Sequence, residues 1–148
     1  MPGVRSLLSP GKAMMSCKVC YLTKEYEFPA LKEALDCFEN GDYARAFELA
    51  LPFAEHGLTI AQCLVGGFYL TGLGGERNGL AAENWLRQAG EGGCALAWHN
   101  LSTLYVVGAP DVEVNRDKAM ECRRKAYENG FDLVAPEGGN NWHGDSIK

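Results

Sequence analysis

The apolar residues of this chain follow a pattern that recurs along the sequence. From Ala82, apolar residues fall three, four and seven positions apart, which places them on one face of a helix. A similar helical stripe begins at Ala97, and a glycine follows each run, Gly93 after the first and Gly108 after the second. Glycine adopts the left-handed backbone conformation that ends many helices. The pattern therefore predicts two helices joined as a hairpin.

This hairpin aligns with two other segments of the chain. The stretch from Ala46 to Gly72 matches the stretch from Ala82 to Gly108 at an offset of 36 residues, and a third copy begins at Ala119. A single hairpin cannot cover its own apolar face, so repeated hairpins must stack and bury a shared seam. Small residues and large apolar ones tend to keep their own columns. The aligned positions include Ala46/Ala82/Ala119, Leu49/Trp85/Cys122, Phe53/Ala89/Ala126, Gly57/Gly93/Gly130, Ala61/Ala97, Tyr69/Tyr105 and Gly72/Gly108.

A shorter unit precedes these copies. It consists of a helix, a tight turn at Asn40 and Gly41, and a second helix for which Asp42 suits the N-cap. Pro52 falls inside that second helix and should kink it. Strand signals are absent from the chain. The helices that we expect span residues 30–39, 42–56, 59–71, 78–90, 95–107 and 116–129.

The segment from Ala97 to Gly130, AWHNLSTLYVVGAPDVEVNRDKAMECRRKAYENG, resembles a Sel-one-like repeat, a relative of the tetratricopeptide repeat. A second copy, AQCLVGGFYLTGLGGERNGLAAENWLRQAGEGG, runs from Ala61 to Gly93, and residues 31–57 resemble a tetratricopeptide-like unit with a shorter turn. The resemblance implies an all-α, right-handed superhelix of about three helix-turn-helix pairs. It also implies that the first helix of each pair lines a concave surface, and that the protein is an adaptor without catalytic activity.

We expect the repeat domain to span residues 30–134, with an N-terminal extension at 1–29 and a C-terminal tail at 135–148.

His99 and Thr103 lie four residues apart on one helix face, and Val106 continues that stripe. A mostly apolar groove on the concave side suits a short peptide or an amphipathic helix of a partner. The alternative is that these positions pack against the next unit or the tail. The expected groove residues are Leu35, Phe38, Cys63, Gly67, Leu70, His99, Thr103 and Val106.

Composition narrows the class of partner. A chain of 148 residues with 47% hydrophobic and 22% charged residues fits one globular domain. The net charge of −5 and the lack of a basic cluster disfavour nucleic-acid binding. No window is apolar enough to span a membrane, and Pro10, Gly11 and Lys12 interrupt any secretory signal. We therefore expect a cytoplasmic protein that binds another protein or peptide, with self-association through the solenoid ends as a further option.

Two alternatives with chemistry of their own remain. Cys17 and Cys20 have the Cys-x2-Cys spacing of zinc and redox sites, but no second such pair completes a zinc site, so we expect no metal or cofactor. His99 with Ser102 or Cys63 could form a nucleophile and base, but no third group is evident to orient the imidazole. We therefore expect no catalytic residue and free thiols at the six cysteines.

Overall fold

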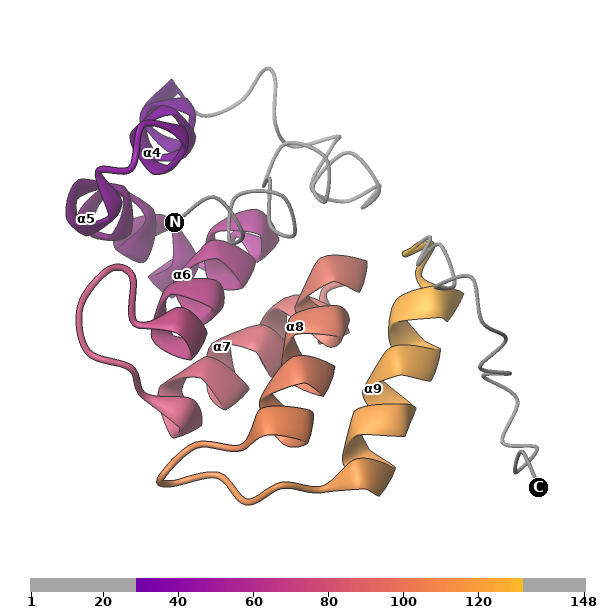
Figure 1. Cartoon of the computed structure of the whole chain (residues 1–148). Coiled ribbons are helices and arrows are strands. Elements are labelled where there is room, and N and C mark those ends of the chain that lie inside the picture. The colour runs from indigo at the N-terminus through magenta and orange to yellow at the C-terminus, as the bar shows by residue number, and fades with distance from the viewer. Residues whose placement is uncertain (1–28, 132–148) are drawn as a thin grey trace.

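The computed structural model describes residues 29–131, and these residues form helices joined by turns and loops (Figure 1). The predicted all-α solenoid of about three helix pairs is confirmed for this part of the chain, and every expected helix end lies within one residue of the observed one. Most of the expected extension, the expected tail, and Cys17 and Cys20 lie outside the described residues. The helices are α4 (Pro29–Glu39), α5 (Tyr43–Glu55), α6 (Thr59–Thr71), α7 (Gly79–Glu91), α8 (Ala95–Val107) and α9 (Arg116–Glu128).

Short polar side chains begin the second helix of each pair. The carboxylate of Asp42 accepts a hydrogen bond from the backbone N–H of Arg45, at 3.3 Å, and so caps α5. Asn78 caps α7 and Asn115 caps α9 in the same way, each at 2.9 Å. These bonds satisfy N–H groups that have no partner within the helix. The second helix of each hairpin therefore begins at a residue that the local sequence determines.

The helices end where the glycine columns predict. Gly93 has a φ of 97° and Gly108 a φ of 73°, in the left-handed region that other residues rarely adopt. The two long loops nevertheless differ: Ala109 and Val112 exchange backbone hydrogen bonds in the loop after α8. Pro110 and Asp111 stand between them in a tight turn, whereas in the loop after α6 the turn is closed one repeat position earlier, by a hydrogen bond from the Gly75 N–H to the Gly72 carbonyl oxygen at 3.3 Å. The two loops therefore close their turns at different positions of the repeat.

Within the second hairpin, α6 and α7 approach closely at a glycine. A Cβ built on Gly66 would lie 2.7 Å from Cγ of Leu86 on α7. Real side chains do not tolerate such a contact, so the absence of a side chain is what allows Leu86 to pack there. Leu86 itself is fully buried. The close approach of α6 and α7 therefore depends on a small residue, Gly66, that faces a large one, Leu86.

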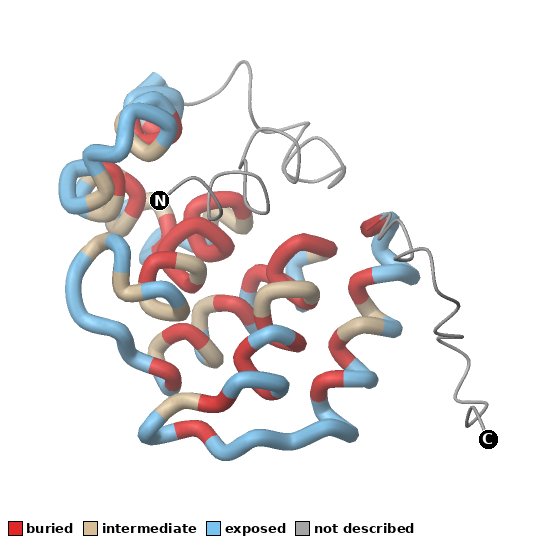
Figure 2. Tube along the Cα trace, in the orientation of Figure 1, coloured by how far each residue is buried: buried red, intermediate tan, exposed pale blue. Residues whose placement is uncertain are grey.

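The hairpins stack in chain order, and the apolar core runs between them. Each helix packs against the next one along the chain, and α6 also lies against α8. Figure 2 shows the buried residues on the sides of the helices that face their neighbours, with exposed residues on the loops and outer turns. Ala46, Ala82 and Ala119, which share one repeat column, are 0%, 0% and 3% exposed. The recurring columns are thus the packing positions of the solenoid.

Candidate functional site

The first helix of the third hairpin, α8, presents an exposed stripe. Val106 is 48% exposed and Thr103 is exposed, while His99, one turn earlier, is partly buried. The Thr103 hydroxyl donates a hydrogen bond to the carbonyl oxygen of His99 at 3.2 Å, so its own helix satisfies it. Val107, 62% exposed, widens the stripe at its C-terminal end. This end of α8 therefore offers apolar surface to solvent.

The first helix of the second hairpin continues the same surface. Gly67 and Leu70 of α6 are partly buried, whereas Cys63 is only 2% exposed and belongs to the core. A Cβ built on Gly67 would lie 4.0 Å from the amide nitrogen of Asn100 on α8, so the two helices adjoin there. We call Gly67, Leu70, Asn100, Thr103 and Val106 the first-helix stripe.

The first hairpin contributes differently from the expectation for the groove. Leu35 is 6% exposed, and the ring of Phe38 packs on those of Tyr43 and Phe68 at centroid distances of 5.3 and 5.5 Å. Because α4 has a single apolar face, that face is taken up by the core. The exposed residues of the described part of α4 are the charged ones and the N-terminal proline: Pro29, Lys32, Glu33, Asp36 and Glu39.

The side chain of His99 is held by packing. Its ring stacks on Phe131, with centroids 4.6 Å apart and planes inclined by 17°. Burial, with a smaller contribution from the positive charge of Arg123, lowers the pKa of His99. Among residues 29–131, neither Nδ1 of His99 nor the hydroxyl of Ser102 has a hydrogen-bond partner. His99 and Ser102 therefore do not form a nucleophile–base pair in this structure.

A polar cluster at the second-hairpin side of α8 escaped the sequence analysis. The hydroxyl of Tyr105, a residue only 2% exposed, donates a short hydrogen bond to the carboxylate of Glu83. Arg87 donates to the same carboxylate at 2.8 Å and to the Tyr105 oxygen at 2.9 Å. The ammonium of Lys118 lies 5.2 Å from the centre of the Tyr105 ring. Glu83 and Arg87 lie four residues apart, which is the only signal in the sequence that points to this cluster.

The part of the chain that the structure describes holds no group of three or more His, Cys, Asp or Glu residues that could bind a metal ion. The same residues include no helix with the length and apolar content needed to cross a membrane.

Burial is the main cause that raises the pKa of the Cys122 thiol. Cys122, which is buried in a repeat column, therefore behaves as a small hydrophobe.

Stacked helix hairpins with an exposed stripe along their first helices define an α-solenoid. A model of the Sel1 repeat matches residues 59–94 and 95–131, which are the second and third hairpins. A solved structure described as a Sel1 repeat protein from Oxalobacter formigenes is similar, with a TM-score of 0.61 and 28% sequence identity. The match covers 69% of this chain and 40% of that chain, so this chain spans less than half of the solved protein.

The chain therefore carries two consecutive Sel1 repeats. The resemblance found in the sequence is therefore confirmed. Sel1 repeats are typically protein–protein interaction modules and are generally without catalytic activity.

Proposed function

We propose that this protein is a non-catalytic adaptor that holds a peptide or a helix of a partner protein against the first-helix stripe. The observation that supports the proposal is the run of partly buried and exposed residues across two adjoining helices, from Gly67 and Leu70 to Thr103 and Val106. Glycine at position 67 lets a partner backbone approach α6 closely. Leu70 and Val106 provide apolar contacts, and Asn100 provides a donor and an acceptor.

The charge of α4 bears on the orientation of the partner. Of its charged residues, three are acidic and one is basic: Glu33, Asp36 and Glu39 against Lys32. A partner that extends from the stripe toward α4 gains from basic residues at that end, because complementary charges steer association. The proposal includes a cytoplasmic location, supported by the free thiols of Cys37 and Cys122. A second copy of the chain is one of the partners that it allows.

The proposal is tested by photo-crosslinking in the native lysate, followed by substitution. A photoreactive residue at position 103 is expected to capture one defined protein, and Leu70→Asp and Val106→Asp are expected to abolish that capture with circular dichroism unchanged. A buried aspartate at the contact would lose its hydration, which costs several times the binding energy of one apolar side chain.

Val114 provides the matched control. It is an exposed valine, 58% accessible, in the loop between α8 and α9. A photoreactive residue at position 114 should capture nothing in common with position 103, and Val114→Asp should leave capture at position 103 unchanged. Equal capture by wild-type protein and both stripe variants would show that the partner binds another face.

A further inference from the structure

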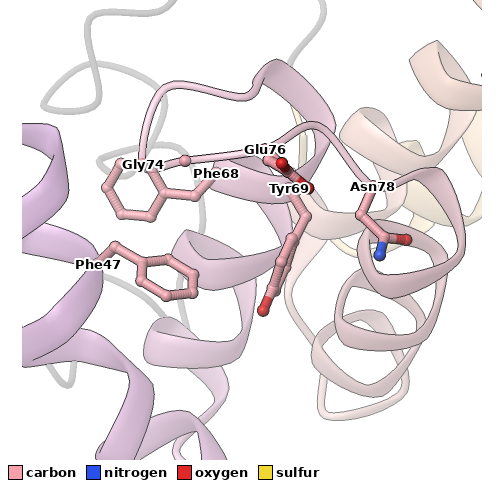
Figure 3. Close-up of a pocket in the computed structure, with 7 residues that line it drawn as sticks. Phe47, Phe68, Tyr69, Gly74, Glu76 and Asn78 are labelled. Carbon is pink, nitrogen blue, oxygen red and sulfur yellow. The ribbon is translucent and has the colours of Figure 1, made fainter.

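A small hollow lies between the first and second hairpins, beside the C-terminal end of α6. Its volume is about 220 Å³. One wall comes from α5, one from the last turns of α6, and the rim from the loop that leads to α7 (Figure 3). None of its residues belongs to the first-helix stripe. The lining residues are Phe47, Phe68, Tyr69, Gly74, Gly75, Glu76 and Asn78.

The walls of the hollow are aromatic. The rings of Phe47 and Tyr69 lie 5.4 Å apart with planes inclined by 88°, and those of Phe47 and Phe68 lie 5.9 Å apart at 78°. Such perpendicular pairs leave part of a ring face uncovered, and the face of an aromatic ring carries negative potential. In Figure 3 the Tyr69 ring stands between Phe47 and Asn78, with Glu76 at the rim.

Glu76 adds a full negative charge to this rim. It is exposed, and within residues 29–131 it forms no ion pair. Its neighbour Arg77 does not neutralise it by pairing, because the Arg77 guanidinium donates to the carbonyl oxygens of Leu70 at 3.1 Å and Gly108 at 2.8 Å. Ring faces and a carboxylate attract the same class of group, a cation.

The next repeat shows how the chain uses the equivalent tyrosine. Tyr105 occupies the column of Tyr69, and there the ammonium of Lys118 lies over the ring at 5.2 Å. Lys118 stands three residues after the cap Asn115. In the preceding hairpin the residue three after the cap Asn78 is Ala81. The chain thus supplies a cation to Tyr105 from its own α9, whereas the same position in α7 carries only the methyl group of Ala81, which has no charge to offer Tyr69.

We propose that the hollow beside Tyr69 binds the guanidinium of an arginine side chain from a partner protein. A planar guanidinium stacks on an aromatic face while its N–H groups reach a carboxylate, which matches rings and Glu76 arranged around one opening. Gly74 packs against the aromatic wall, where a Cβ would lie 3.0 Å from Cβ of Phe47, and a Cβ on Gly75 would meet nothing within 4 Å, so the rim is open at position 75. The inference goes beyond the adaptor function, and because the two surfaces share no residue, either can fail without the other.

The test uses two capped peptides, Gly-Arg-Gly and Gly-citrulline-Gly, titrated into the full chain labelled with ¹⁵N at constant ionic strength. Citrulline has nearly the shape of arginine without its charge. The arginine peptide is expected to shift the amide signals of Gly74, Gly75 and Glu76 along a saturable curve. The citrulline peptide is expected to leave them in place. Equal shifts with both peptides, or no shift with either, would overturn the proposal.

Three variants localise the binding. Glu76→Gln should raise the Kd by up to about fivefold, the worth of one exposed ion pair. Ala81→Lys should place an ammonium over Tyr69, as Lys118 does over Tyr105, and compete with the peptide while preserving the fold. Glu113→Gln, which removes an exposed carboxylate from the other long loop, is the matched control and should change nothing. Unchanged affinity in both Glu76→Gln and Ala81→Lys would place the arginine elsewhere and refute the site.

Discussion

At the scale of single residues, one column of the repeat holds two kinds of contact. Tyr69 packs its ring edge-on against Phe47. Tyr105, one repeat later, is hydrogen-bonded to Glu83, which takes the column of Phe47. Burial is the largest of the causes that raise the pKa of Tyr105, so its hydroxyl remains a protonated donor. The column of Tyr69 and Tyr105 therefore keeps the same side chain in both repeats, while the groups that contact it differ.

The two tyrosines should respond differently to loss of the hydroxyl. Tyr105→Phe removes one of the hydrogen-bond donors to the Glu83 carboxylate, whose side chain is only 19% exposed. We therefore expect the free energy of unfolding to fall by about 1–2 kcal/mol. Tyr69→Phe keeps the ring contact with Phe47, so its effect should stay within about 0.5 kcal/mol. Urea unfolding of both variants measures the difference. Equal losses would show that the Glu83 bond contributes no net stability.

Groove residues were harder to predict than packing residues, for a physical reason. A heptad-like spacing identifies an apolar face, but it does not say whether that face meets the core or a partner. In α4 the apolar residues Leu35 and Phe38 pack inward. In α8 both faces carry apolar residues, so Val106 remains exposed after Leu101 and Leu104 are buried. The polar cluster around Tyr105 depends on contacts between helices, which no local pattern encodes.

At the scale of elements, helix ends were predictable because local residues determine them. Asp42 at a cap and Gly93 at a stop act within one turn of their own position. The loop after α8 was only partly predictable. Its Asp111 carboxylate accepts a hydrogen bond from the backbone N–H of Leu80 at 3.1 Å, at the start of α7. That bond joins residues 31 positions apart, which is beyond the range of turn signals in the sequence.

Two adjacent glycines in α6 provide a test of close packing between elements. Gly66→Ala would drive a Cβ to 2.7 Å from Leu86 Cγ, and 3.1 Å from the Leu86 backbone nitrogen, so the helices must move apart. We expect a loss of about 1–3 kcal/mol in unfolding free energy. Gly67→Ala meets only the Asn100 amide at 4.0 Å, and the gain in helix propensity should stabilise the protein by about 0.5–1 kcal/mol. Thermal and urea unfolding distinguish the two signs, and destabilisation by Gly67→Ala would refute the argument.

At the scale of the whole molecule, hydrogen bonds from the two long loops link the second hairpin to the third. Arg77, in the first loop, donates to the carbonyl oxygen of Gly108 at the end of α8. Asp111, in the second loop, accepts from Leu80 at the start of α7. In a solenoid each hairpin is stabilised mainly by its neighbours, so these bonds contribute to the coupling between hairpins. Loss of one such bond should therefore destabilise the hairpins that it joins more than the hairpin that it does not touch.

Removing one of these bonds should loosen the molecule on one side. Arg77→Ala is expected to cost about 1–2 kcal/mol and to speed amide hydrogen exchange in α8 and α9 more than in α4 and α5. Arg45→Ala is the matched control. Arg45 pairs with Glu33 at 3.2 Å within the first hairpin, and both side chains are more than half exposed, so its removal should cost no more than about 0.5 kcal/mol. A uniform rise in exchange across all the described helices would contradict coupling by neighbours.

The two links between these hairpins lie at opposite ends of their helices. At one end the backbone itself passes from α7 to α8 through Gly92 and Gly93, and at the other Arg77 and Asp111 bridge the loops. These two links act together with the packing of α6 and α7 against α8 to fix how the second and third hairpins sit relative to each other. The spacing between α6 and α8, across which the proposed partner would lie, is therefore set at both ends of the helices as well as by the core between them.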